Sequence, residues 1–301
     1  MTSSLRHSDS RSPSVPLTKG RLSYIGLIKR TKDELGDDHV GAFAGSLTYH
    51  TLLAIFPFTI FVLSVLFLAG QQSLLTDGIS NLQESGALSA SAASTISTQV
   101  EEIASSRSGA LGFSVVISIL TALWATSGAF RSIMEATNVM YEVEETRGFV
   151  RRYATSIILS IVVAALFIVA LGLVVAGPAV ADQLGDIGRW LWLVLQWPVL
   201  IAFVLLGLSL VYYYAPSAEQ KFKFVSPGSI IAAAVWLVFS LVFSYYVSNF
   251  GSYNKVYGTL AGAIILMLYV YYTSFIFLFG AEANQIIESA APEGKDPGDK
   301  R

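Results

Sequence analysis

The chain has 301 residues, of which 53% are hydrophobic and only 13% are charged, and its formal net charge is −2. An average soluble domain is about 25% charged, whereas here the hydrophobic residues gather in runs of about 20, the length that crosses a bilayer. The composition therefore excludes an ordinary soluble protein and predicts an all-α, polytopic membrane protein. The absence of cysteine excludes disulfides, thiolate catalysis and cysteine-ligated metals.

The N-terminal segment precedes any long apolar run. Residues 1–20 are Ser-rich and polar and contain no apolar stretch of the kind found in a signal peptide, so we predict a disordered cytoplasmic tail. Residues 21–36 predict an amphipathic helix, with an apolar side made by Leu22, Ile25, Ile28 and Leu35. Such a helix either lies at the membrane surface or packs on neighbouring loops, and the sequence leaves both arrangements open.

The first long apolar segment, residues 40–69, contains a single ionisable side chain, His50. A straight helix of this length would be ~45 Å long, whereas the hydrocarbon core of a bilayer is about 30 Å thick. We therefore expect residues 52–69 to cross the membrane and the more polar residues before them to be buried in protein, with a kink at Pro57. Helical spacing places Ser46, Tyr49 and His50 on one face, which is a candidate substrate-binding face together with Pro57.

His50 has two interpretations in this position. As an ionisable group in an apolar segment, it is either a proton-responsive or substrate-contacting residue, or a neutral histidine that is hydrogen-bonded between helices. The face that it shares with Ser46, Tyr49 and the Pro57 kink is the stronger candidate.

Five further spans follow, near Leu111–Phe130, Ala154–Gly177, Trp190–Tyr213, Gly228–Phe250 and Gly258–Ala281. The longest connection, residues 71–109, precedes them. It predicts two short amphipathic helices folded over the outer mouth of the bundle, which form either a lid or a hairpin that gates nothing.

Small residues at helical spacing mark the first, second and last spans. They are Gly41 and Gly45, then Ser114, Ser118, Thr121, Ala125 and Gly128, and finally Gly258 and Gly262. Such stripes typically mark close helix contacts, so these spans are expected to pack together, and the same faces offer a route to a homo-oligomer. Tyr269, Tyr271 and Tyr272 lie in mid-membrane in the last span, and Ser118 and Tyr272 complete the candidate substrate-binding set.

The orientation follows from the positions of Lys and Arg. Sixteen of the nineteen fall on one side of the alternating spans and three on the other. The positive-inside rule therefore predicts six transmembrane helices in one domain, residues 21–288, with both termini and the tail 289–301 in the cytoplasm of a plasma (inner) membrane protein. Basic residues are expected in cytoplasmic loops for reasons of topology alone, so their presence does not indicate nucleic-acid binding. Membrane lipids are the expected partners.

The sequence contains no pattern that indicates catalysis. The histidines at positions 7, 39 and 50 lack metal-ligand spacing, and phosphate-binding and nucleophile-elbow motifs are absent. We therefore predict a protein that is not an enzyme and has no cofactor or metal. At the cytoplasmic side the sequence predicts an inner-mouth polar cluster, in which Arg131, Asn138, Glu145 and Arg147 of the 131–152 loop pair with Glu282 and Asp38. Its candidate members are Asp38, Asn138, Glu145, Arg147, Glu282 and Asn284. The alternative is a set of ordinary solvated charges.

Several motifs together resemble those of the YihY/BrkB family of bacterial inner-membrane proteins. They are Ser46-Leu47-Thr48-Tyr49 to Phe56-Pro57, Asn138…Tyr141…Glu145-Thr146-Arg147, Gly228…Trp236, Tyr257-Gly258-Thr259-Leu260-Ala261-Gly262 and Gly280-Ala281-Glu282-Ala283-Asn284. The resemblance covers residues 20–288, although the family pattern has an aromatic residue where His50 stands. It implies six transmembrane helices with both ends inside, and a family that is labelled both as a virulence or serum-resistance factor and, by misassignment, as a ribonuclease.

The sequence leaves two functions open. A transporter-like protein that handles a small-molecule or lipidic substrate predicts a cavity lined by Tyr49, His50, Ser118 and Tyr272. A non-transporting scaffold for envelope partners predicts a closed bundle in which these side chains pack against one another.

Overall fold

The computed structural model describes residues 22–68, 110–183, 185–218, 222, 224–249 and 259–290, together with residues 15 and 18 and a few positions between 76 and 98. The two helices expected within residues 71–109 lie outside the described residues, apart from those few positions. Most of the expected tails, 1–20 and 289–301, also lie outside them.

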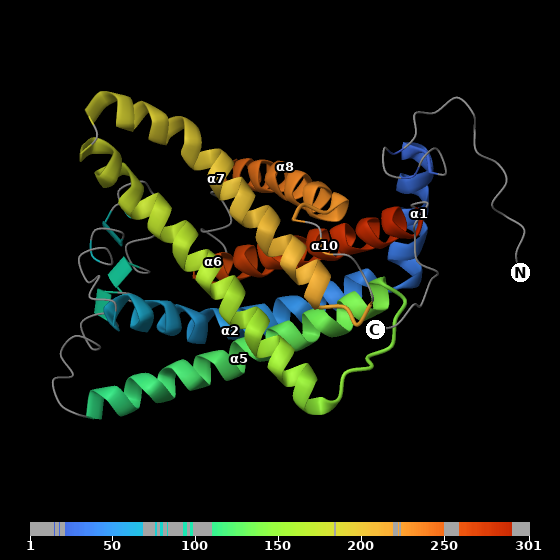
Figure 1. Ribbon diagram of the computed structural model, residues 1–301, viewed down its shortest axis with the longest axis horizontal. Helices are drawn as coiled ribbons and strands as arrows, with labels where there is room; N and C mark the ends of the chain where they lie inside the picture. Colours follow the sequence, from blue (N-terminus) through green and yellow to red (C-terminus); the bar gives the residue numbers. More distant parts are fainter. Residues whose placement is uncertain are drawn as a thin grey trace, which may run out of the picture. The chain divides into compact units, whose positions relative to one another are not determined.

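The described chain is all-helical (Figure 1). Its long helices are α1 (Tyr24–Asp37), α2 (Val40–Leu68), α5 (Ala110–Met140), α6 (Phe149–Gln183), α7 (Gly185–Tyr214), α8 (Pro227–Asn249) and α10 (Thr259–Ala290). Four of them contain segments that are long and apolar enough to cross a membrane, which are Phe149–Val174, Gly185–Tyr214, Pro227–Ser248 and Ala261–Ala290. The prediction of a polytopic helical membrane protein is confirmed.

The first two expected spans fall on α2 and α5, which are 29 and 31 residues long. Residues 40–55 of α2 form an apolar helix, and α2 continues through position 57 without interruption. α6, α7 and α10 extend beyond the spans expected from the sequence. α10, for example, was expected to end near residue 281 but continues to Ala290, because its polar last turns pack inside the protein and are buried up to Ile287.

The chain divides into two compact units, and four helices contribute to both. The first unit comprises residues 1–52, 129–156 and 205–301, and the second comprises residues 53–128 and 157–204. α2, α5, α6 and α7 therefore each have one end in each unit.

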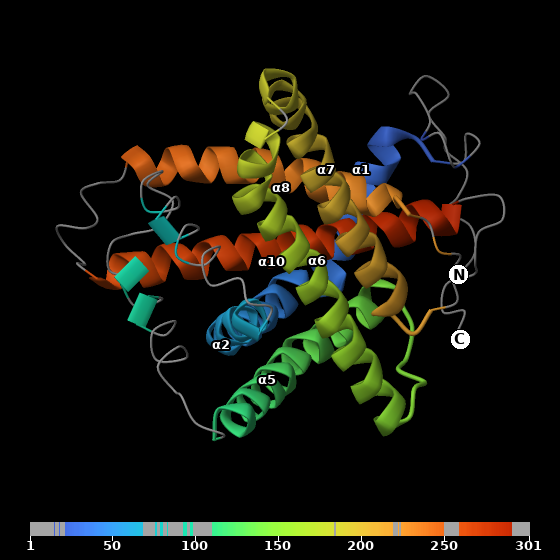
Figure 2. The same cartoon turned by 60° about the vertical axis from the view of Figure 1, so that its left-hand side comes forward.

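The first unit has an apolar core to which α2, α5, α7, α8 and α10 contribute. Its fully buried side chains include Val40, Met140, Tyr212 and Leu278. α8 and α10 lie side by side in both views (Figures 1 and 2) and pack closely. Their contact depends on glycine: a Cβ on Gly228 would lie 2.2 Å from the carbonyl oxygen of Gly280, closer than any side chain tolerates.

The predicted N-terminal helix exists as α1, and it packs against α10. It begins where the Ser23 hydroxyl accepts a hydrogen bond of 3.0 Å from the Gly26 N–H, a typical N-cap. Leu27 is buried with Ile286 and Ile287 of α10, whereas the predicted apolar side of α1 leaves Ile25 and Ile28 exposed. Within the expected tail, Val15 and Thr18 are buried too, Val15 in the same cluster as Leu27.

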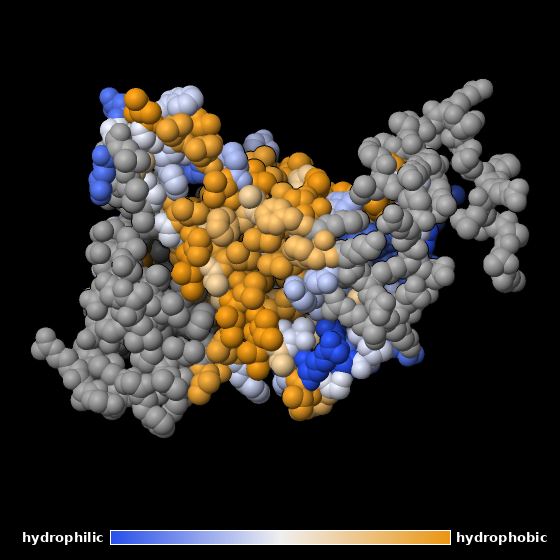
Figure 3. Space-filling model, in the orientation of Figure 1, coloured by the Kyte–Doolittle hydropathy of each residue, from blue (hydrophilic) through white to orange (hydrophobic). Residues whose placement is uncertain are grey.

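The second unit exposes large apolar side chains, as a protein surface in contact with lipid does. On α7 they include Trp190, Leu193 and Trp197. Figure 3 shows apolar residues, in orange, over α6 and α7. Inside this unit the ring of Trp192 lies on Gly177 of α6, where a Cβ would come within 1.8 Å of it.

Candidate functional site

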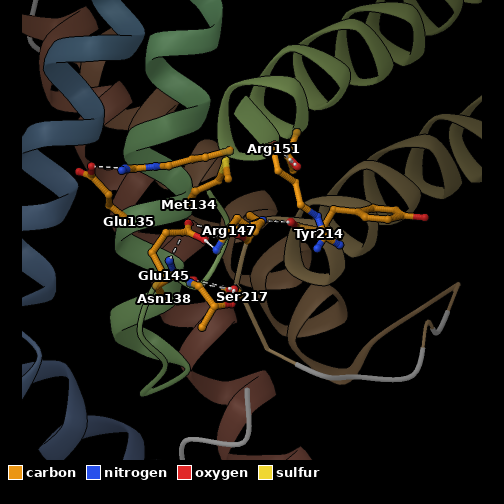
Figure 4. A network of polar contacts seen from close by, with 12 residues as sticks. Met134, Glu135, Asn138, Glu145, Arg147, Arg151, Tyr214 and Ser217 are labelled. Carbon is orange, nitrogen blue, oxygen red and sulfur yellow. Dashed lines mark hydrogen bonds and ion pairs between the residues drawn. The ribbon is translucent and has the colours of Figure 1, made fainter. Parts of the chain in front are cut away.

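The most extensive polar network of the first unit joins the α5–α6 connection to the end of α7 (Figure 4). The Arg147 guanidinium donates to both carboxylate oxygens of Glu145, at 2.7 and 2.9 Å. It also donates to the carbonyl oxygens of Tyr214 and Ala215, at 3.0 and 2.7 Å. Arg147 therefore neutralises a carboxylate and caps the negative end of the α7 dipole with the same planar group.

Asn138 joins the same network from the last turn of α5. Its amide nitrogen donates to Glu145 at 3.2 Å, and its amide oxygen accepts from the Ser217 N–H at 2.6 Å. The Thr146 and Ser217 hydroxyls lie 2.8 Å apart. α7 stops just before these residues because Pro216 disfavours a helical conformation in the residue that precedes it. The result is a loop held on both sides by side chains.

The charges of this network set the pKa of Glu145. Burial raises the pKa of its carboxyl, but the hydrogen bonds and charge of Arg147, with the bond from Asn138, lower it by more. The net pKa of Glu145 therefore lies below its ordinary value, so this carboxylate is ionised at neutral pH and serves as an acceptor.

Asn284 of α10 organises a second group of contacts. Its amide oxygen accepts from the Gly228 N–H at 3.0 Å, at the start of α8, and its amide nitrogen donates to the Tyr141 hydroxyl at 2.8 Å. α8 begins at Pro227 because Ser226 caps it, with its hydroxyl accepting from the Ser229 N–H at 3.1 Å. Burial raises the pKa of Tyr141, so its hydroxyl stays protonated.

The inner-mouth cluster expected from the sequence is thus two groups with different pairings. Asn138, Glu145 and Arg147 pair with one another, and Arg131 lies over the Tyr153 ring at 4.3 Å. The expected pairing of Arg147 with Glu282 is wrong, because Arg147 binds Glu145 instead.

The two remaining members of the expected cluster meet each other. The carboxyl groups of Glu282 and Asp38 lie within hydrogen-bonding reach of each other. Two acidic groups therefore face each other where the sequence predicted an acid and a base.

The residues of the candidate substrate-binding face are also described in part. The expected burial of the polar part of α2 in protein is wrong for Ser46 and Tyr49, which are exposed. His50 is half-buried beside the Tyr49 ring, with 5.4 Å between ring centroids. Tyr272 of α10 is exposed as well. The side chains of Pro57 and Ser118 lie outside the described residues.

His50 contacts two oxygen atoms through one ring nitrogen. Its Nδ1 lies 2.9 Å from the Ser46 carbonyl oxygen and 3.1 Å from the Ser132 hydroxyl of α5. A carbonyl oxygen only accepts hydrogen bonds, so the Ser46 contact favours the tautomer with the proton on Nδ1, in which Nδ1 is not a base toward Ser132. This arrangement matches the interpretation of His50 as a histidine bonded between helices.

The sequence did not indicate four residues that form hydrogen bonds in these groups, which are Ser132, Tyr141, Ser217 and Gly228. Ser217 had one available signal, because Ala215-Pro216-Ser217 directly follows a long apolar run and so marks a helix end. Among the described residues, no group of three or more His, Cys, Asp and Glu is suited to hold a metal ion.

The small-residue stripes of the sequence lie in unequal surroundings. Gly41 is packed, with the Tyr271 hydroxyl 3.4 Å from the position of its Cβ, whereas Gly45 and Gly262 have nothing within 4 Å. The tight glycine contact of the first unit is therefore the one between Gly228 and Gly280.

Comparison with known proteins gives a consistent result. Residues 31–301 match the family model described as "Virulence factor BrkB". The chain is 33% identical over 250 residues to "Putative ribonuclease-like protein YfkH" of Bacillus subtilis (strain 168), covering 81% of this chain and 88% of that protein. It is 29% identical over 273 residues to "UPF0761 membrane protein Smlt0865" of Stenotrophomonas maltophilia (strain K279a), covering 86% of this chain and 62% of that protein. No solved structure matches the chain.

Proposed function

The chain belongs to the BrkB family of membrane proteins, and from that premise we propose that it is a transporter-like inner-membrane protein that handles a small-molecule or lipidic substrate. In this proposal it spans the membrane six times, with α2 and α5 added to the four apolar segments described above. Both termini lie in the cytoplasm. The support for this orientation is the distribution of Lys and Arg, of which sixteen in nineteen fall on one side of the spans.

The observation that carries the proposal is the open polar face at the start of α2. This helix buries the apolar side chains of Val40, Ala44 and Leu47, while Ser46 and Tyr49 remain exposed, Tyr49 by 62%. A helix in lipid normally turns its polar side chains toward the protein interior or a water-filled space. A hydroxyl-bearing face that none of the described residues covers is therefore assigned to contact with a polar or amphipathic molecule.

An enzymatic role is not part of this proposal. The name of the Bacillus relative includes the words "ribonuclease-like". His50 and Ser132 lie within hydrogen-bond distance, but the Ser46 carbonyl oxygen favours the tautomer with the proton on Nδ1. Hydrolysis by this pair would need Nδ1 free to accept the serine proton. We therefore propose that the chain is not a ribonuclease.

The partners in this proposal are membrane lipids and a second copy of the chain. Gly45 and Gly262 are exposed and have open space at the Cβ position. Small residues that are not used for packing within one chain permit close approach of another helix. A scaffold that binds envelope proteins through its loops is the competing function.

The test is transport by the purified full chain in lipid vesicles. One assay follows translocation of a fluorescently labelled phospholipid, and a second follows release of entrapped small polar solutes. We expect activity from the wild type and a loss of about tenfold or more in Tyr49→Ala, because its ring and hydroxyl make up most of the open face.

The matched control is Tyr245→Ala, which removes an exposed tyrosine from α8 and is expected to retain wild-type activity. Equal activity of the two variants would remove α2 from the site. Wild-type vesicles that move neither probe would favour the scaffold function.

A further inference from the structure

Glu282 is a buried acidic residue whose charged neighbours are mainly acidic. It lies on α10, within the apolar segment Ala261–Ala290, and is only 2% exposed. Its Oε2 atom has no hydrogen-bond partner among the described residues. A buried, ionised carboxylate normally binds a cation or several N–H groups, since burial without partners is costly. Among the described residues, Glu282 has neither a bound cation nor several N–H donors.

The neighbour that Glu282 does have is another acid. Asp38 follows the last residue of α1, where its N–H donates to the Glu34 carbonyl oxygen at 2.8 Å. The next residue, His39, has a φ of 51°, and this left-handed conformation lies between the end of α1 and the start of α2. The Asp38 carboxyl thereby comes within hydrogen-bonding reach of Glu282.

A hydrogen bond between two carboxyl groups requires a proton. An ionised carboxylate has only acceptor atoms, so two ionised groups cannot bond to each other. Two carboxyls that share a site likewise lose their second proton with difficulty, because like charges repel at short range. The contact therefore describes a pair that holds one proton.

The surrounding charges act in the same direction. Glu34 of α1 and Glu142 of the α5–α6 connection face the pair. The guanidinium of Arg30 opposes them, but it is engaged with Glu34 at 3.6 Å on the partly exposed side of α1. Tyr141 also faces the pair and is neutral.

The pKa of Asp38 reflects these surroundings. Burial raises it, and Glu34, Glu142 and Asp37 raise it further, while the bond from Glu282 acts in the opposite sense. Glu282 is buried, whereas Asp38 is only partly buried. A negative charge is less costly on the more exposed group, so we assign the proton to Glu282 and the acceptor role to Asp38.

We propose that Asp38 and Glu282 form a proton-binding site that joins the α1–α2 turn to α10. In the protonated state the Glu282 hydroxyl donates to the Asp38 carboxylate and holds this turn on α10. Release of the proton to water leaves two carboxylates in contact, and their repulsion loosens the turn. This inference concerns binding of a proton and does not depend on the transport of any substrate.

Infrared difference spectroscopy of the full chain in lipid vesicles tests the site, because the carbonyl stretch of a protonated carboxyl is separate from that of a carboxylate. In the wild type we expect a protonated-carboxyl band at neutral pH that disappears on alkaline titration. Glu282→Gln, which keeps the shape and is permanently neutral, should abolish the band. Asp38→Asn should move the titration to lower pH by about one unit or more, because one like charge is removed.

Asp33→Asn is the matched control, because Asp33 is an exposed acid on the same α1 helix. It should leave the band and its titration unchanged. A band that persists in Glu282→Gln, or its absence from the wild type at neutral pH, overturns the proposal. Exchange of sodium for potassium at fixed pH should have no effect, and displacement of the band by sodium would identify a metal-cation site instead.

Discussion

Replacement of Arg147 tests whether the contacts of the α5–α6 connection stabilise the protein. The Arg147→Ala variant removes both bonds to the Glu145 carboxylate and both bonds to the α7 carbonyls. The side chain of Arg147 is 7% exposed and that of Glu145 is 21% exposed, so this ion pair is largely withdrawn from water. Its partners cannot all regain solvent when the guanidinium is lost.

The size of the effect follows from these contacts. Breaking a fully buried ion pair costs about 3–5 kcal/mol, and hydrogen bonds to charged groups contribute about 1.5–3 kcal/mol each without being additive. Because Glu145 retains some access to water, we expect Arg147→Ala to lower the free energy of unfolding by about 2–4 kcal/mol. Arg147→Lys should cost about 1–2 kcal/mol, since an ammonium cannot satisfy the carboxylate and both carbonyls in one plane.

The assay is reversible unfolding of the purified protein in mixed micelles, with Arg151→Ala as the control. Arg151 is an exposed arginine four residues away on α6, and its loss should change the free energy of unfolding by less than about 0.5 kcal/mol. A double-mutant cycle with Glu145→Gln should show coupling of the two residues. Equal stability losses in Arg147→Ala and Arg151→Ala would refute the reasoning.

Three further predictions use the same protein. Because the folded-state pKa of Glu145 is lowered, its stabilising contribution is complete above about pH 4.3 and is lost as the pH falls below it, so the acid-induced loss of unfolding free energy should be smaller in Glu145→Gln. Gly280→Ala should destabilise by about 1–3 kcal/mol, since its Cβ would lie 2.5 Å from the Ala232 Cβ; Gly45→Ala, with nothing within 4 Å, should not, and equal effects in the unfolding assay would count against the α8–α10 contact. Because the chain has no cysteine, Lys300→Cys should react with an impermeant thiol reagent only from the cytoplasm and Gln72→Cys only from outside, and any other pattern contradicts the six-span orientation.

Sequence alone predicted the helices well because their signal is local. A run of about 20 apolar residues specifies a spanning helix whatever its neighbours are. The ends were less predictable, as α10 shows: Asn284 and Ile286 continue the helix because Asn284 finds partners on α8 and in the turn after α5. Such partners lie far away in the sequence.

The pairing of charges was the part that could not be predicted. Arg147 was expected to reach an acid on α10, yet it folds back onto Glu145, two residues away. The contact of Asp38 with Glu282 depends on the positive φ of His39. The residue type does not predict this backbone conformation. A sequence shows which groups need partners, but the turns decide which partners they meet.

The contacts of Asn284 have a consequence for the order in which the protein is completed. Tyr141 is synthesised 143 residues before Asn284, and Gly228 is synthesised 56 residues before it. Until α10 enters the membrane, the Tyr141 hydroxyl and the Gly228 N–H lack the side chain that joins them in the finished fold. In a nascent chain, the start of α8 and the turn after α5 therefore each lack this hydrogen-bond partner. When α10, the last described helix, is inserted, the single amide of Asn284 binds both. A chain that ends before Asn284 therefore lacks the side chain that joins the turn after α5 to the start of α8.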